Sequence, residues 1–281
     1  MKILNPYNNE KAQKNRSKND DNAYSPRKKK AFGQHFLRKQ SVVDHMIEAV
    51  SVTSETSVLE IGCGDGFLTK AILTSTPCKR LQVFEIDPEW ADYVRGTIRD
   101  PRLKVTLANV LEIDFEAELG AQRPWVLLAN LPYQITFPIL FLVQKYKHLF
   151  TEGVVMVQEE VAHKIVAQRG RGYNPSTLFL QYHFEWRMME RIEPGAFVPP
   201  PKINSRLLYF KPKMDVKLIP DEERFWAFLK LCFRSPRQTL RNNLKTTHLP
   251  IDRLSPEQLG LRAQQMSFEG FLALWQQLVA K

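Results

Sequence analysis

The sequence predicts an α/β fold with a mainly parallel sheet, followed by a small all-helical domain. Strand-like and helix-like segments alternate from residue 57 to about residue 168. This order is typical of a parallel sheet with helices on both faces. Beyond Lys213, apolar residues recur only at helical spacing. With 281 residues, the chain is long enough for two domains.

The predicted elements follow one another along the first part of the chain. From Ser41 onward, apolar residues recur at helical spacing and predict a helix to about residue 50. Pro88 is expected at the first turn of a later helix, because its fixed φ suits that position. The strands are expected at residues 57–61, 81–86, 103–107, 125–129 and 153–158, and further helices at 66–73, 88–98, 137–149 and 159–168.

The end of the sheet is expected to be antiparallel. Short strands at 187–192 and 206–210 flank a rigid proline-rich turn at 197–201. Lys211-Pro212-Lys213 is interpreted as a linker. The predicted division is therefore a polar, disordered basic tail at residues 1–29, a sheet-containing domain at 30–212 and a helical domain at 213–281.

The helical domain is expected to begin with helices at 221–233 and 235–245. Ser235 is a favoured cap and Pro236 suits the first helical position, so one helix is expected to stop and another to start there. On a continuous helix, three basic residues at i, i+4 and i+8 would line one face: Arg237, Arg241 and Lys245.

Composition excludes several classes of protein. Apolar residues make up 43% and charged residues 25%, as in soluble globular proteins. No apolar run approaches the roughly 20 residues needed to span a bilayer, and the amino terminus lacks the apolar core of a secretory signal. The 3 cysteines form no CxxC pair. A reducing, cytoplasmic location without disulfides, metal or membrane is therefore expected.

The charge balance indicates a polyanionic partner. The formal net charge is +10, and basic side chains bind phosphates with release of counterions. Residues 1–30 hold nine Lys or Arg against three acids, and residues 224–250 contain no Asp or Glu. These blocks fit nucleic-acid binding, although a solvated tail and a solvated helix face would have the same composition.

A glycine-rich loop follows the first predicted strand. Gly62, Gly64 and Gly66 alternate between that strand and a helix, where a ligand can approach the backbone closely. Glu85 follows at the end of the second strand, where a carboxylate can accept both hydroxyls of a ribose. Asn109 follows the third strand, either to bind an adenine edge or to form a turn. The spacing suits a dinucleotide or S-adenosylmethionine, but the loop is not the GxGxxG typical of NAD sites.

The tetrapeptide Asn130-Leu131-Pro132-Tyr133 ends the fourth predicted strand. The Asn130 side-chain oxygen and the Leu131 carbonyl could accept hydrogen bonds from an exocyclic base amine, and Tyr133 could stack on the flipped base. An ordinary proline turn, with Asn as a cap and Tyr as packing, explains the same residues one by one.

The order of these motifs resembles class I S-adenosylmethionine-dependent methyltransferases that act on an exocyclic amine. Further matching segments are Lys30–Leu37, Val157–Ala162, Ala196–Ser205 and Arg237–Leu244. Together they are similar to the ribosomal RNA adenine N6,N6-dimethyltransferase family, specifically its KsgA-type small-subunit members. The resemblance runs from about Lys28 to Lys245.

This resemblance implies a Rossmann-like catalytic domain that uses S-adenosylmethionine. The implied reaction is dimethylation of the N6 amine of two adjacent adenosines in a 3'-terminal hairpin of small-subunit (16S) ribosomal RNA during 30S assembly. The implied enzyme is a monomer without metal. It implies cofactor contacts from His35, Leu37, Gly62, Glu85, Asn109 and Asn130, catalytic contacts from Asn130, Leu131, Tyr133 and Phe197, and RNA contacts from Arg237, Arg241 and Lys245.

Some positions depart from the family pattern. Asn109 stands where Asp is common, Cys63 where Pro is frequent, and Gln134 where Asn is frequent. Asn174-Pro175-Ser176-Thr177 replaces a Gly-Xaa-Leu-Ser run. Phe197 fits a second aromatic face for the base and equally a core position beside a proline turn.

The same motifs leave three alternative functions. One is a large-subunit (23S) adenine dimethyltransferase that confers antibiotic resistance and shares the catalytic core. Another is a non-catalytic RNA-binding ribosome assembly factor, which would be expected to have a degraded tetrapeptide or glycine loop, and here both are intact. An NAD-dependent oxidoreductase is disfavoured by the loop spacing.

Overall fold

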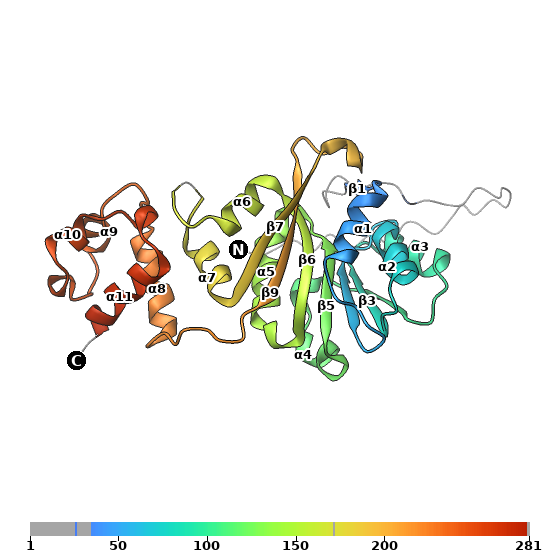
Figure 1. Ribbon diagram of the computed structural model, residues 1–281, viewed down its shortest axis with the longest axis horizontal. Coiled ribbons are helices and arrows are strands. Elements are labelled where there is room, and N and C mark those ends of the chain that lie inside the picture. The colour runs from blue at the N-terminus through green and yellow to red at the C-terminus, as the bar shows by residue number, and fades with distance from the viewer. Residues whose placement is uncertain (1–25, 27–34, 171, 280–281) are drawn as a thin grey trace, which may run out of the picture.

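The computed structural model describes residues 26, 35–170 and 172–279. The predicted disordered tail at residues 1–29 lies outside the described residues apart from Pro26, as do residues 30–34 of the first matching segment. Within the described part of the chain, none of the helices combines the length and apolar character needed to cross a membrane. Figure 1 shows a broad lobe built around a sheet and a narrower lobe made only of helices.

One sheet of seven strands forms the centre of the broad lobe, in the order β4-β3-β2-β5-β6-β9-β7. Its parallel strands are β2 (Ser57–Ile61), β3 (Arg80–Glu85), β4 (Leu103–Leu107), β5 (Trp125–Asn130) and β6 (Phe150–Gln158). The last two, β7 (Phe184–Ile192) and β9 (Ser205–Pro212), are antiparallel. This confirms the predicted α/β class, parallel core and antiparallel end. Lys211 and Pro212 belong to β9, so the linker predicted at 211–213 starts later than expected.

Helices cover both faces of the sheet, because successive strand residues point to opposite sides. Val58 packs in a core with α1 (Gln40–Glu48), α2 (Phe67–Ser75) and α3 (Pro88–Thr97). Its neighbour Leu59 packs in a second core with α4 (Phe115–Leu119), α5 (Thr136–Lys145), α6 (Glu159–Val166) and α7 (Pro175–His183). The helices bury both faces at the centre of the sheet, which explains why β5 is almost wholly apolar and why β2 is buried along its whole length.

A second, two-stranded sheet lies beside the main one. Strand β1 (Phe36–Leu37) pairs antiparallel with β8 (Phe197–Val198). Neither strand was predicted, since each has only two residues. The pair brings the described N-terminal segment to the proline-rich turn between β7 and β9 (Figure 1).

Helix α7 was also missing from the predicted elements. Asn174 caps it by accepting hydrogen bonds from the backbone N–H groups of Ser176 and Thr177, and Pro175 occupies its first position. This capping box with an N-terminal proline is a recognisable helix start. The start of α7 could therefore have been predicted from the sequence.

The narrow lobe has its own apolar core. Helices α8 (Glu222–Cys232), α9 (Leu240–Leu244), α10 (Pro256–Gly260) and α11 (Phe268–Val279) pack around buried residues that include Phe225, Phe228, Phe271 and Trp275. Leu178 and Tyr182 of α7 join the same core. Helix α7 thereby connects the two lobes.

The helix predicted at 235–245 is wrong in its first half. Residue Thr239 forms an antiparallel bridge with Arg262, and the Leu240 N–H donates to the Leu261 carbonyl at 2.8 Å. This extended pairing prevents a helix through residue 239. The Thr239 side chain instead caps the short helix α9. Arg237 consequently lies in a turn before α9, and the three basic residues do not line one continuous helix face.

Candidate active site

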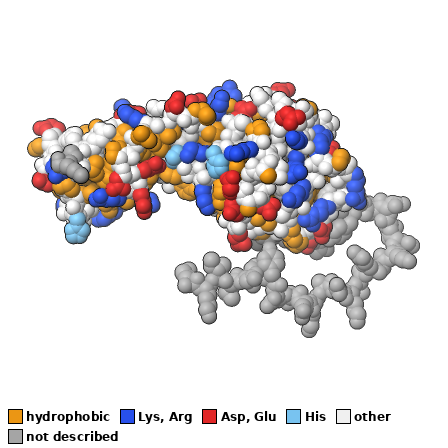
Figure 2. Space-filling view, turned by 90° about the horizontal axis from the view of Figure 1, so that it is seen from below, with side chains coloured by type: hydrophobic (Ala, Val, Ile, Leu, Met, Phe, Trp, Pro, Cys, Tyr) orange, Lys and Arg blue, Asp and Glu red, His pale blue; other side chains and the backbone are white. Residues whose placement is uncertain are grey.

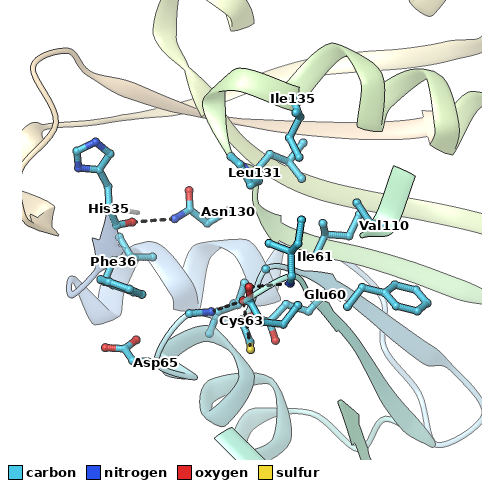
Figure 3. A pocket seen from close by; sticks show the side chains of 18 of the residues that line it. His35, Phe36, Glu60, Ile61, Cys63, Asp65, Val110, Asn130, Leu131 and Ile135 are labelled. Atoms are coloured by element: carbon cyan, nitrogen blue, oxygen red, sulfur yellow. Dashed lines mark hydrogen bonds between the residues drawn. The ribbon is translucent and has the colours of Figure 1, made fainter. Parts of the chain in front are cut away.

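A pocket opens at the carboxyl ends of the parallel strands, the edge at which α/β sheets bind ligands (Figure 3). It is formed by the segment before α1, the loop after β2, the end of β3, the turn after β4 and the tetrapeptide after β5. Of the predicted cofactor and catalytic residues, the pocket brings together His35, Leu37, Gly62, Glu85, Asn109, Asn130, Leu131 and Tyr133.

The glycine loop adopts a backbone that favours glycine. Gly62 has φ +77°, and no atom lies within 4 Å of where a Cβ would stand. Gly64 has φ +51°, and there a Cβ would approach the Phe36 ring to 2.5 Å. Gly62 therefore leaves space at the pocket, whereas Gly64 allows the Phe36 ring to close over the loop.

Glu85 is buried at the end of β3 and is bound to backbone. Its Oε1 accepts from the N–H groups of Ile86 and Asp87, both at 2.9 Å. Its Oε2 accepts from the Gly64 N–H at 3.2 Å, so the carboxylate also fastens the glycine loop. Burial raises the pKa of Glu85, and these backbone donors act in the opposite direction.

Two further acidic residues of the pocket were not predicted as site residues. Glu60 lies in β2 with 1% of its surface exposed, and burial raises its pKa to about 8. Asp65 lies in the glycine loop and pairs with Arg38. An acidic residue inside an apolar strand run was the available signal for Glu60, because buried carboxylates are rare without a partner or a function.

Asn109 lines the pocket but uses its amide locally. Its Oδ1 accepts from the Leu111 N–H at 3.2 Å, and its Nδ2 donates to Glu112 at 2.9 Å. It caps the short 3-10 helix Val110–Glu112. Asn109 therefore forms the turn and borders the pocket at the same time.

The acceptor loop, Asn130–Tyr133, is held in place by hydrogen bonds of three of its residues. Asn130 Nδ2 donates to the His35 carbonyl at 3.2 Å (Figure 3). The Leu131 N–H donates to the Met156 carbonyl at 3.1 Å. Tyr133 continues into a short 3-10 helix, and its hydroxyl lies 2.7 Å from Ser205 Oγ.

Phe197 and the basic residues lie outside the pocket. Phe197 is 2% exposed and pairs with Leu37 in the core on the β1 side of the sheet. Arg237, Arg241 and Lys245 are exposed in the narrow lobe. In Figure 1 that lobe lies at the opposite end of the molecule from β1 and β3. No group of three or more His, Cys, Asp or Glu suited to a metal occurs in the described residues.

Comparison with known proteins identifies the family. Residues 25–261 match the family described as ribosomal RNA adenine dimethylase. The chain belongs to the ribosomal RNA adenine dimethylase family. It is therefore an rRNA adenine dimethyltransferase, and the predicted resemblance is confirmed.

Relatives of similar length support this family membership. The chain is 36% identical over 253 residues to the ribosomal RNA small subunit methyltransferase A of Syntrophotalea carbinolica, covering 87% of this chain and 94% of that protein. It is 33% identical over 251 residues to the protein of the same name from Chlorobium phaeobacteroides, covering 89% of this chain and 91% of that protein.

Solved structures show the same Rossmann-like fold. A dimethyladenosine transferase from Plasmodium falciparum superposes with a TM-score of 0.73 at 24% identity, covering 85% of this chain and 96% of that one. The 23S rRNA methyltransferase ErmE superposes with a TM-score of 0.67 at 22% identity, covering 87% of this chain and 100% of that one. At these identities the likeness concerns the fold alone.

Proposed function

We propose that this dimethyltransferase transfers methyl groups from S-adenosylmethionine to the N6 amine of two adjacent adenosines in small-subunit ribosomal RNA. The observation that carries the proposal is the Asn130 amide, which borders the pocket with its Nδ2 bound to a backbone carbonyl. Its Oδ1 is thereby directed away from that carbonyl and can accept a hydrogen bond from an amine (Figure 3).

The charge of the pocket supports S-adenosylmethionine over NAD. Asp65 and Glu85 line it, with Arg38 paired to Asp65. Glu60 also lines it, but burial raises its pKa to about 8, so it adds little negative charge at neutral pH. A sulfonium and an ammonium are favoured beside carboxylates, whereas the pyrophosphate of NAD is repelled by them. Gly62 leaves space for close approach to the loop. Glu85 is proposed to hold the ribose, and Gly62 the methionine end.

The remaining cofactor contacts are proposed from the pocket lining. His35 and Leu37 border it from the N-terminal segment, and Asn109 borders it from the turn after β4. The apolar side chains of Ile86 and Val110 also line it and suit an adenine ring. The cofactor supplies an activated methyl group on a sulfonium centre.

Orientation is the main contribution of the protein to the transfer. The amine lone pair of adenine is delocalised, so acceptors are needed to aim it at the methyl carbon. Asn130 Oδ1 and the Leu131 carbonyl are proposed to supply them. Tyr133 is proposed to stack on the flipped base. Formation of the new N–C bond would break the S–C bond of the sulfonium and release S-adenosylhomocysteine. The cationic amine would then lose its proton to water, so no strong base is required.

The RNA-binding surface is proposed to include the narrow lobe. Most of its apolar core comes from residues 213–281, which supports the proposed division at residues 212 and 213, although α7 of the first domain also contributes Leu178 and Tyr182. Arg237, Arg241 and Lys245 are exposed there and are proposed to contact phosphates. On the face seen in Figure 2, Lys and Arg side chains are distributed over both lobes, interspersed with acidic ones. A long RNA could therefore contact both.

Methyl incorporation by Asn130→Ala tests the function. We expect the variant to bind S-adenosylhomocysteine nearly normally and to lose transfer to assembling small subunits. Gln276→Ala, which removes an exposed amide on α11, is the control and should transfer normally. Full turnover by Asn130→Ala would refute the proposal. Preferential methylation of protein-free large-subunit RNA by the wild type would favour the 23S alternative, and an inactive wild type would favour the assembly factor.

A further inference from the structure

His35 makes three contacts, two with the acceptor loop and one with the turn between β7 and β9. Its carbonyl accepts from Asn130 Nδ2 at 3.2 Å. Its imidazole is stacked with the Tyr133 ring, with centroids 5.9 Å apart and planes 26° apart. Its Nδ1 lies 2.9 Å from the Pro199 carbonyl oxygen. One residue thus contacts both functional side chains of the acceptor loop.

The contact with Pro199 fixes the imidazole. A carbonyl oxygen only accepts hydrogen bonds, so Nδ1 must carry a proton and donate. The ring is therefore tied to the turn between β7 and β9 on one side and stacked with Tyr133 on the other. Rotation of the ring would break both contacts.

The contact with Asn130 fixes the amide. An amide rotated by 180° would place Oδ1 against the His35 carbonyl, where two acceptors repel each other. The observed orientation satisfies Nδ2 and directs Oδ1 elsewhere (Figure 3). An Asn130 rotated the other way would present donors to an amine that is itself a donor.

Ser205 holds the other end of Tyr133. Its Oγ lies 2.7 Å from the Tyr133 hydroxyl, and Ser205 is fully buried at the start of β9. It pairs with Gln158 of β6 and Ile192 of β7, so its position is set by both neighbouring strands. The ring of Tyr133 is therefore restrained by His35 at its face and by Ser205 at its hydroxyl.

The residues after His35 contact the cofactor side instead. The Phe36 ring lies against Gly64, and Arg38 pairs with Asp65 of the same loop. Figure 3 shows the side chains of His35 and Phe36 pointing apart. Adjacent residues of one short segment thus serve two different halves of the pocket.

We infer that His35 and Ser205 are positioning residues for methyl transfer, which hold Asn130 and Tyr133 in the orientation that receives the adenine. The inference rests on the proposed function. It adds a second role to the proposed cofactor contact of His35, because it assigns the main effect of the imidazole to turnover and not to cofactor affinity.

The test separates these two roles of His35. We expect His35→Ala, which removes the imidazole stacked with Tyr133 and keeps the backbone carbonyl that accepts from Asn130, to lower kcat at saturating S-adenosylmethionine by about tenfold or more. Its S-adenosylhomocysteine affinity should change by no more than about twofold. His35→Phe retains an aromatic ring and should recover part of the lost kcat. If His35→Ala instead weakens S-adenosylhomocysteine binding and keeps the kcat, or changes neither, the inference fails.

Ser205 is tested by a double-mutant cycle with Tyr133. Ser205→Ala and Tyr133→Phe remove opposite ends of one hydrogen bond, so each should lower kcat similarly and the double variant no further. Additive losses would overturn the assignment of Ser205. Thermal melting of each variant establishes that it is folded. An inactive wild type would overturn the proposed function and this inference with it, whereas an active wild type with unaffected variants overturns the inference alone.

Discussion

Thr69 Oγ1 donates a 2.7 Å hydrogen bond to the Glu60 carboxyl beneath the glycine loop. Thr69 is fully buried in α2, and Glu60 is 1% exposed in β2. The negative charges of Glu85 and Asp65 add to the effect of burial on Glu60, and Thr69 opposes it only in part. The structure thus keeps a carboxyl group largely protonated at neutral pH, in a pocket proposed to receive a cation.

Glu60 should make the protein less stable as pH rises. The pKa of Glu60 is about 8 in the folded protein, against an ordinary value of 4.5. Between these two pH values the Glu60 carboxyl is ionised in the unfolded chain and protonated in the native protein. The free energy of unfolding should fall through this window by up to about 1.4 kcal/mol per pH unit. Urea denaturation of Glu60→Gln at pH 5 to 8 should lack this slope. The exposed Glu55→Gln should retain it, and identical slopes for Glu60→Gln and wild type would contradict the prediction.

The buried His183 should make the protein less stable as pH falls, which is the opposite of the effect of Glu60. Burial lowers its pKa to about 4 from 6.5, and Lys147 and Lys213 contribute. The unfolded chain therefore takes up a proton that the native protein excludes, and stability is lost as pH falls from about 6.5 toward 4. His183→Phe keeps a ring beside Phe179 and should flatten the acid limb of a stability profile. The exposed His248→Gln is the control, and an unchanged acid limb in His183→Phe would count against this account.

Gly153→Ala should destabilise the centre of the sheet. A Cβ at Gly153 would stand 2.7 Å from the Leu127 carbonyl oxygen and 2.6 Å from the Phe210 ring. The carbonyl belongs to the neighbouring strand β5 and cannot move freely, so we expect a loss of about 2 kcal/mol in denaturant unfolding. Gly96→Ala, where nothing lies within 4 Å, should be neutral or stabilising. If Gly153→Ala were as stable as the wild type, the prediction would be wrong, because the sheet would have made room for the added methyl group.

Neutralising Arg237, Arg241 and Lys245 should weaken RNA binding in a salt-dependent manner. Each lost phosphate contact should reduce the slope of log affinity against log salt by roughly one unit. Titrations of small-subunit RNA at several salt concentrations measure this slope. A matched triple variant at Lys79, Arg95 and Lys104, which pair with acids on the broad lobe, should change it less. An unchanged slope in the first variant would remove these residues from the interface.

Much of the fold could be predicted because its signals are local. The strands expected at 57–61 and 103–107 have those bounds in the structure, and β5 is one residue longer than expected. Continuous apolar runs between turn residues suffice to locate buried parallel strands. The order of glycine loop, Glu85, Asn109 and acceptor loop likewise follows from strands that end at one edge.

Apart from α7, whose capping signal is local, the elements that were missed depend on distant partners. Strands β1 and β8 have two residues each and exist only through their pairing with each other. At residues 235–239 the local cap signal was outweighed by the pairing of Thr239 with Arg262. In the site, the sequence could not show that Asn130 contacts His35 or that Tyr133 contacts Ser205, because those contacts join segments far apart in the chain.

The pairing of β1 with β8 also has a consequence for the order in which the protein matures. His35 and Pro199 are 164 residues apart in the sequence, so the N-terminal wall of the pocket cannot close until the turn after β7 has been synthesised. Long-range contacts of this kind form late, since their loop must be closed first. During translation the glycine loop and β2 to β5 can assemble while residues 35–38 still lack their partner strand. A nascent chain can therefore complete this pocket only after residues 197–199 have been synthesised.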